Sequence, residues 1–190
     1  MTDPRRPLLF WLAVGAVGFL LVPWYALGDS VFAFGWVPRI ADREAAPALL
    51  QVLAHGKAWL AVPGLLIAAG AALLRPGLAR NVRANALIAI GAAGFVYCFA
   101  QGFAIGPAGW SYAWLGAALP PLAGGQSGMG LGALLAITSF GVLFALGLAG
   151  RGYFKGDPFV AASVVGMAAL IVVFTFFPVF RILISALQDG

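Results

Sequence analysis

The chain has 190 residues, of which 63% are hydrophobic and only 9% carry a charge, and its mean hydropathy is +1.00. Water-soluble domains contain about 45–50% apolar and about 25% charged residues, so this composition excludes a soluble globular domain and a disordered chain. One cysteine cannot form an internal disulfide, and one histidine with one cysteine cannot build a His/Cys metal centre. We therefore expect a polytopic membrane protein.

Five uncharged apolar stretches have, or nearly have, the length that a membrane span requires. A helix needs about 20 apolar residues to cross a hydrocarbon core about 30 Å thick. The stretches are Leu8–Leu27, Ala58–Leu74, Asn85–Ile105, Met129–Ala149 and Val160–Phe180, and none contains Asp, Glu, Lys, Arg or His. Each must be helical, because lipid offers no partner for unpaired backbone groups. The predicted fold class is all-α: a polytopic helical membrane protein with five transmembrane helices.

The first stretch is interpreted as a retained span rather than a secretory signal. Arg5 and Arg6 precede it, as basic residues precede a signal core. However, the stretch is long for such a core and ends in Pro23, Trp24 and Tyr25 instead of a small-residue cleavage site.

The distribution of Lys and Arg over the loops predicts the orientation, because positive charge accumulates on the cytoplasmic side. One side collects seven basic residues and the other four: Arg5, Arg6, Arg75, Arg80, Arg83, Arg151 and Lys155 against Arg39, Arg43, Lys57 and Arg181. We place the N-terminus in the cytoplasm and the C-terminus outside, in a bacterial inner membrane. The net charge of +5 is not gathered on one face, so it does not indicate nucleic-acid binding.

Both outer loops are expected to carry a short interfacial helix. In residues 28–57, Pro47 suits a first helical position and Gly56 a stop just past the end. In residues 106–128, aromatic side chains that mark the headgroup level precede a Pro-Pro stop at 120–121: Trp110, Tyr112 and Trp114. Such aromatics usually anchor a protein at the interface, and ligand stacking is the alternative.

Three residues in or near the spans are candidates for a transport path or for helix packing: Gln101, Pro178 and Arg181. Gln101 can bond a neighbouring helix or face a polar cavity, and Pro178 is expected to kink its span. Arg181 either snorkels to the outer phosphates, which we favour, or turns into the bundle. No charge lies within a span, and this disfavours self-contained ion coupling.

The motif Gly125-Gln126-Ser127-Gly128 resembles the GxSG nucleophile motif of rhomboid proteases, and Trp36 and Arg39 add a faint likeness. A serine nucleophile needs a base within hydrogen-bond reach. In rhomboids this base is a histidine on a later span, but the only histidine here, His55, precedes the motif. We therefore expect no catalysis at Ser127, and we assign no catalytic, cofactor-binding or metal-binding residue.

The last segment, Val172–Gly190, reads VVFTFFPVFRILISALQDG. An apolar run leads to Pro178, then to Leu183 and Ser185, and the segment ends in a polar turn with glycine. This order resembles the first core span of ATP-binding-cassette importer permeases. The four preceding spans, with their Arg-rich inner loops, resemble the N-terminal extension of long permeases of the iron(III)-importer type.

The resemblance implies two domains: a four-helix membrane extension over 1–159 and the first core permease span, truncated, over 160–190. It implies a membrane-embedded permease segment of an ATP-driven importer for iron(III) or a similar small solute. The implied partners are the lipid bilayer and, through parts outside this chain, a cytoplasmic ATPase and a periplasmic binding protein. The family's Glu-Ala-Ala docking loop is missing, because the only glutamate, Glu44, lies in an outer loop. We therefore expect an N-terminal fragment, and no site residue can be transferred.

A competing interpretation is a complete five-span membrane protein with a structural or assembly role and no transported substrate. A third interpretation, an intramembrane enzyme, is opposed by the lack of paired catalytic groups.

Overall fold

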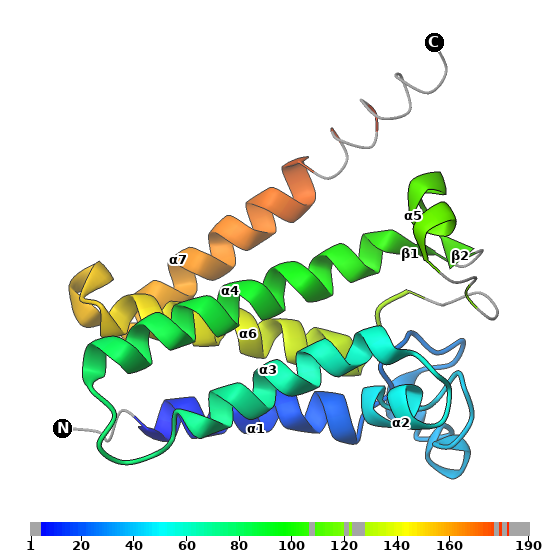
Figure 1. Cartoon of the computed structure of the whole chain (residues 1–190), viewed down its shortest axis with the longest axis horizontal. Helices are drawn as coiled ribbons and strands as arrows, with labels where there is room; N and C mark the ends of the chain where they lie inside the picture. The colour runs from blue at the N-terminus through cyan, green and yellow to red at the C-terminus, as the bar shows by residue number, and fades with distance from the viewer. Residues whose placement is uncertain are drawn as a thin grey trace.

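The structure is a computed structural model that describes residues 5–106, 109–119, 122, 128–176, 179 and 182. Its main elements are long helices: α1 (Arg5–Leu20), α3 (Ala61–Ala72), α4 (Arg80–Ala104), α6 (Leu131–Gly150) and α7 (Pro158–Ile171). Helices α1, α3, α4 and α6 lie side by side, and α7 leans away from them toward its C-terminal end (Figure 1). The described residues are mostly helical, as predicted, and their one hairpin has two strands of two residues each.

Among the described residues, three helices are long and apolar enough to cross a membrane: Arg80–Ala104, Leu131–Gly150 and Pro158–Thr175. They coincide with the third, fourth and fifth predicted spans. The last of them continues α7 into a π-helical turn, Val172–Phe176. The two other predicted spans are also helical, but their helices are shorter than the sequence pattern suggested.

The first predicted span ends early, because α1 stops at Leu20 and has 16 residues. The chain beyond it is extended: Pro23 pairs with Pro47, and Tyr25 pairs with Met129, in isolated antiparallel bridges. Proline has no N–H to continue a helix, and the bridges give this segment other backbone partners. The apolar run to residue 27 therefore belongs partly to the helix and partly to the loops that cover its end.

The second predicted span begins with a 3₁₀ turn, Ala58–Leu60, which continues directly into α3. Pro63 lies in the first turn of α3, where a missing N–H interrupts few helical bonds. It does leave the Trp59 carbonyl without a helical donor from residue 63. The Tyr97 hydroxyl of α4 donates to that carbonyl at 2.8 Å and so ties α4 to the start of α3.

One end of the bundle, here called the loop end, is covered by residues 21–60, 105–106, 109–119 and 128–130 (Figure 1). Its elements are 3₁₀ turns at Val31–Ala33 and Val37–Arg39, helix α2 (Ala48–Leu53), hairpin strands β1 (Ile105–Gly106) and β2 (Gly109–Trp110), and helix α5 (Ala113–Ala118). A short helix is present in each of the two loops as expected, but Pro47 is the N-cap of α2 and not its first helical residue. The predicted stop at 120–121 lies outside the described residues.

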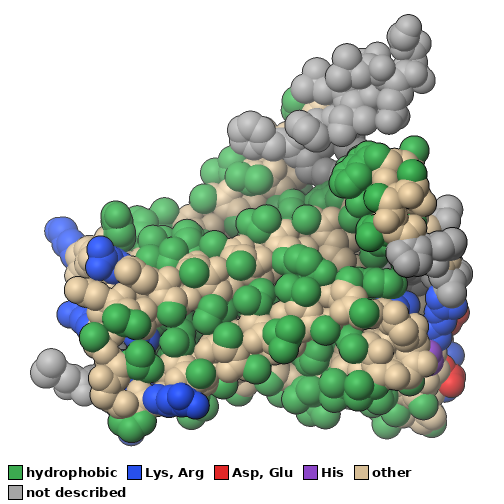
Figure 2. All heavy atoms as spheres, viewed as in Figure 1, with side chains coloured by type: hydrophobic (Ala, Val, Ile, Leu, Met, Phe, Trp, Pro, Cys, Tyr) green, Lys and Arg blue, Asp and Glu red, His purple; other side chains and the backbone are tan. Residues whose placement is uncertain are grey.

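The other end, here called the turn end, holds the turns at 73–79 and 151–157, the second of which contains the 3₁₀ segment Tyr153–Gly156. Figure 2 shows Lys and Arg at both ends of the molecule and a broad uncharged, largely hydrophobic band between them. This arrangement agrees with the confinement of charge to the predicted loops, because the long apolar helices run between the two ends.

Helix α6 is the centre of the core, since it contacts α1, α4 and α7. Its Phe140 and Leu143 side chains are fully buried. Small residues allow the close approach of neighbours: a Cβ on Gly91 of α4 would lie 2.7 Å from the Phe140 carbonyl oxygen. On the other side, a Cβ on Gly18 of α1 would lie 2.6 Å from the Gly132 carbonyl oxygen. Contacts of this kind are typical of tightly packed membrane helices.

Candidate functional site

The loop end holds a group of polar side chains, buried except for the half-buried Trp59, that we call the loop-end cluster: Tyr25, Gln51, Lys57, Trp59 and Gln101. They come from the segment after α1, from α2, from the turn before α3 and from α4. Polar groups are rarely buried without partners. Their convergence beside the apolar core makes this the candidate functional site.

Lys57 is the charged member of the loop-end cluster, and only 5% of it is exposed. Its Nζ lies 4.1 Å from the centroid of the Tyr25 ring, which is a cation–π contact. Burial, together with the positive charge of Arg43, lowers the pKa of the Lys57 ammonium from about 10.5 to about 8. The aromatic face compensates only part of the lost hydration, so this site favours either a neutral amine or an added negative partner.

Gln51 fixes the loop around Lys57. Its side-chain Nε2 donates to the carbonyl oxygens of Arg43 at 2.7 Å and Ala46 at 3.2 Å. The backbone carbonyl oxygen of Gln51 accepts from the Lys57 backbone N–H at 3.0 Å. The Oε1 atom of its side chain is buried without a partner among the described residues. The Gln51 side-chain amide therefore stabilises the loop through its Nε2, while its Oε1 has no donor among the described residues.

Three further buried atoms of this region, Trp24 Nε1, Tyr25 Oη and Trp59 Nε1, make no hydrogen bond of regular geometry within the described part of the chain, although Trp59 and Gln101 interact with the Tyr25 hydroxyl. Each unpaired buried polar group costs about 1–3 kcal/mol, so a polar ligand or ordered water has favourable partners here.

Gln101 is the one sequence-predicted candidate that this structure describes. It lies on α4, is only 7% exposed, and sits close to the Tyr25 hydroxyl together with Trp59. The structure therefore assigns it to a polar surrounding at the loop end and not to the lipid-facing side of α4. The other two candidates, Pro178 and Arg181, lie outside the described residues, and so does Ser127 of the GxSG motif.

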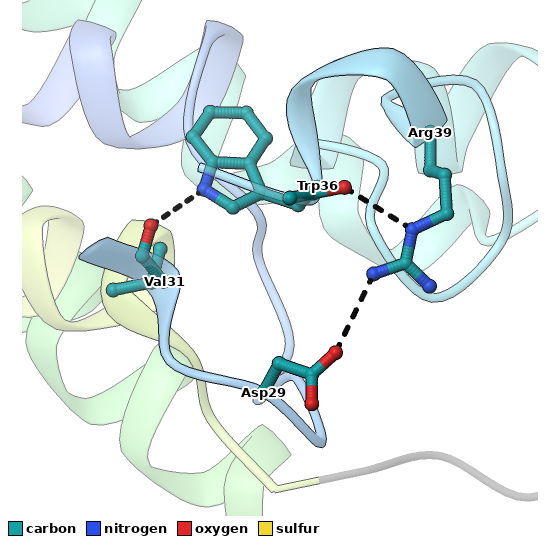
Figure 3. A network of polar contacts seen from close by, with 5 residues as sticks. Asp29, Val31, Trp36 and Arg39 are labelled. Atoms are coloured by element: carbon teal, nitrogen blue, oxygen red, sulfur yellow. Dashed lines mark hydrogen bonds and ion pairs between the residues drawn. The ribbon is translucent and has the colours of Figure 1, made fainter. Parts of the chain in front are cut away.

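A second feature of the loop end is an open charged cleft of about 360 Å³, whose charged lining residues are Asp29, Arg39, Asp42, Arg43 and Glu44. Figure 3 shows its best-defined contacts. Arg39 lies 3.8 Å from the Asp29 carboxylate, and its Nε donates to the Gly35 carbonyl oxygen at 3.3 Å. The Trp36 indole donates to the Val31 carbonyl oxygen at 2.8 Å. Trp36 and Arg39 thus order their own loop, and as an exposed pair Arg39 and Asp29 contribute little stability.

His55 was expected to be solvated or interfacial, and it is partly exposed near α2. Its Nε2 lies 3.1 Å from the Ala41 carbonyl oxygen, within hydrogen-bond distance. Among the described residues no group of three or more His, Cys, Asp or Glu side chains could hold a metal ion.

The burial of Lys57 was missed by sequence reasoning, which counted this residue only as a flanking positive charge. A signal was available in its position between α2 and an apolar span that begins at once with Ala58 and Trp59. The Tyr25 partner carries no such signal, because the two residues meet only after the chain has folded back.

In comparisons with known proteins, no family model, curated protein or solved structure matches the chain.

Proposed function

We propose that this chain is the membrane-embedded part of the permease of an ATP-driven importer. It lies in a bacterial inner membrane with five spans, its N-terminus in the cytoplasm and its C-terminus outside. Its solute is iron(III) or a similar small solute, and its partners are a cytoplasmic ATPase and a periplasmic binding protein that dock through other parts of the permease.

The five-span insertion is supported by the way the two shorter helices lie against the longer ones. Helices α1 and α3 contact each other, and they contact α6 and α4 respectively. All run between the same loop end and turn end (Figure 1). At 1.5 Å per residue, the 16 residues of α1 span about 24 Å. A helix this short is accommodated by local bilayer thinning and by flanking basic residues.

The permease assignment is carried by the separation of α7 from the four-helix body. Only 6% of its most apolar stretch is buried, compared with 44% of that of α6. One narrow stripe, which includes Ala161 and Val165, packs against Ala145 and Ala149 of α6. Helix α7 begins at Pro158, close to the boundary between residues 159 and 160 that the resemblance implies. A first core span must also leave most of its surface for other core helices, and α7 does so.

The competing function is a structural or assembly role without a transported substrate. The same exposed face of α7 is compatible with this role, because an assembly factor also offers an apolar helix to partners. The resemblance of Val172–Gly190 to a core permease span favours transport.

The test is to tag the protein in the bacterium that encodes it and to purify it from native membranes in mild detergent. After reconstitution with the periplasmic fraction, we expect ATP hydrolysis and ATP-dependent uptake of radioactive iron(III). The control is the same preparation with a non-hydrolysable ATP analogue. Transport is contradicted if the purified protein hydrolyses no ATP and a deletion strain takes up iron(III) at the parental rate. A loss of membrane assembly in that strain would instead support the competing role.

A further inference from the structure

The turn end contains a second cleft, of about 550 Å³, between α1, α4, α6 and α7. Its lining is mainly apolar, with two arginines at its edge: Pro7, Leu8, Arg80, Arg83, Ala84, Leu87, Leu146, Ala149, Gly150, Gly156 and Pro158. The cleft thus combines an apolar floor, directed along the helices, with positive charge at the level where the helices begin. None of the functions above uses it.

The two arginines differ in what they can still bind. Arg83 is held by the protein, since its Nε donates to the Leu73 carbonyl at 3.1 Å and its Nη2 to the Arg75 carbonyl at 3.2 Å. Arg80 donates only from its Nε, to the Gly150 carbonyl oxygen at 3.2 Å. Within the described residues its two Nη atoms meet no acceptor. The Arg80 guanidinium is therefore positioned by one bond and has a free edge of donors suited to a phosphate.

The start of α4 adds backbone donors to the same place. Helix α4 begins at Arg80, and its N-cap residue Ala79 provides no side-chain cap. The first N–H groups of a helix lack intrahelical partners and attract anions. The start of α7 differs, because Asp157 caps it by accepting from the Phe159 N–H at 2.8 Å and the Val160 N–H at 3.2 Å. This carboxylate is the one acidic group of the described residues at the turn end, and its Oδ1 is already bonded.

We propose that this turn-end cleft binds one anionic phospholipid from the cytoplasmic leaflet. The phosphate lies between the Arg80 guanidinium and the uncapped start of α4, and acyl chains cover Leu87, Leu146 and the neighbouring apolar lining. Basic pockets between membrane helices on the cytoplasmic side are known to suit such headgroups. A free phosphate ion would satisfy the charge but leave the apolar floor uncovered. The inference rests on the proposed membrane insertion and orientation.

The test uses the full chain, purified in detergent and stripped of lipid. Phosphatidylglycerol, phosphatidylcholine and inorganic phosphate are titrated separately, and binding is followed by native mass spectrometry and by the thermal unfolding midpoint. We expect phosphatidylglycerol to bind about tenfold more tightly than phosphatidylcholine, because both lipids carry a phosphate but the choline ammonium of phosphatidylcholine offsets that charge and is repelled by the Arg80 guanidinium. Inorganic phosphate alone should leave the unfolding midpoint unchanged.

The variant Arg80→Gln should lose this preference for phosphatidylglycerol, whereas Arg80→Lys should keep most of it. The matched control, Arg39→Gln at the loop end, should keep all of it. Equal binding of the two lipids by the wild-type chain overturns the proposal even if Arg80→Gln does not fold. So does a phosphate effect equal to that of phosphatidylglycerol, or an unchanged preference in Arg80→Gln. The insertion is measured separately by cysteine labelling, so a failed lipid site is distinguishable from a failed topology.

Discussion

The Ser139 hydroxyl of α6 donates a hydrogen bond of 2.7 Å to the Trp11 carbonyl of α1. Ser139 is fully buried, and Gly15 provides the space beside it, because a Cβ there would lie 2.7 Å from the Ser139 Oγ. The bond therefore joins two helices through a carbonyl that already serves the α1 backbone. Interhelical bonds of this kind contribute about 0.6–2 kcal/mol in membrane proteins.

Replacing Ser139 by alanine should lower the free energy of unfolding by about 1 kcal/mol, because the interhelical hydrogen bond is lost with little change of volume. The measurement is unfolding of the purified protein in mixed micelles, followed by tryptophan fluorescence. The neighbouring Thr138 is exposed, so Thr138→Ala is the matched control and should be neutral. Equal effects of the two substitutions would refute the contribution of the Ser139–Trp11 bond.

Gly91→Val should destabilise the protein strongly, by about 3 kcal/mol or more, since overpacking of a core commonly costs about 1–3 kcal/mol. A Cβ at position 91 meets the backbone of α6 at Phe140 and Phe144, which cannot move as a side-chain end can. The control is Gly166→Val on α7, where nothing lies within 4 Å of the added Cβ. Expression level in membranes and the unfolding midpoint report the difference. A normal midpoint for Gly91→Val would mean that α4 and α6 are not packed this closely.

The lowered pKa of Lys57 predicts a rise in stability at alkaline pH. Below about pH 8 both the folded and the unfolded protein bind the proton, and the full cost of burying the ammonium is present. Between about pH 8 and 10.5 the folded protein has released a proton that the unfolded chain still binds, so stability increases with pH. The gain should be at most about 3 kcal/mol over this range, since each unit between the two pKa values corresponds to about 1.4 kcal/mol.

Lys57→Met removes this titration while keeping an unbranched chain of similar length. We expect its unfolding free energy to vary less between pH 7.5 and 10.5 than that of the wild-type chain, as measured by denaturant titration in micelles. Arg43→Gln is the informative companion, because it removes the positive charge that contributes to the shift. Parallel pH profiles of the wild type and Lys57→Met would exclude a buried, destabilised ammonium.

The long helices could be predicted from the sequence because an uncharged apolar run in a membrane forms a helix whatever the rest of the chain does. The apolar runs from Asn85, Met129 and Val160 correspond to α4, α6 and α7, and the Pro47 and Gly56 signals correctly enclosed α2. The early end of α1 could not be predicted, because the extended segment after Leu20 depends on partners far away in the chain. Tyr25 pairs with Met129, and no local sequence pattern predicts this bridge.

The sites were less accessible to sequence reasoning than the spans. Gln101 was recognised because an amide is conspicuous within an apolar helix. Lys57 and Arg80 were counted only as flanking charges, since hydropathy does not distinguish a lysine that lies over a buried tyrosine from one in water. The free donors of Arg80 depend on where Gly150 ends α6, which is again a long-range contact.

Cysteine labelling tests the five-span topology most directly. The native Cys98 is fully buried and should stay unlabelled, so single cysteines can be added at exposed positions: Phe32→Cys at the loop end and Tyr153→Cys at the turn end. With a membrane-impermeant maleimide on intact cells, Phe32→Cys should be labelled at once, and Tyr153→Cys only after the membrane is permeabilised. Labelling of Tyr153→Cys in intact cells, or protection of Phe32→Cys until permeabilisation, would contradict the proposed topology.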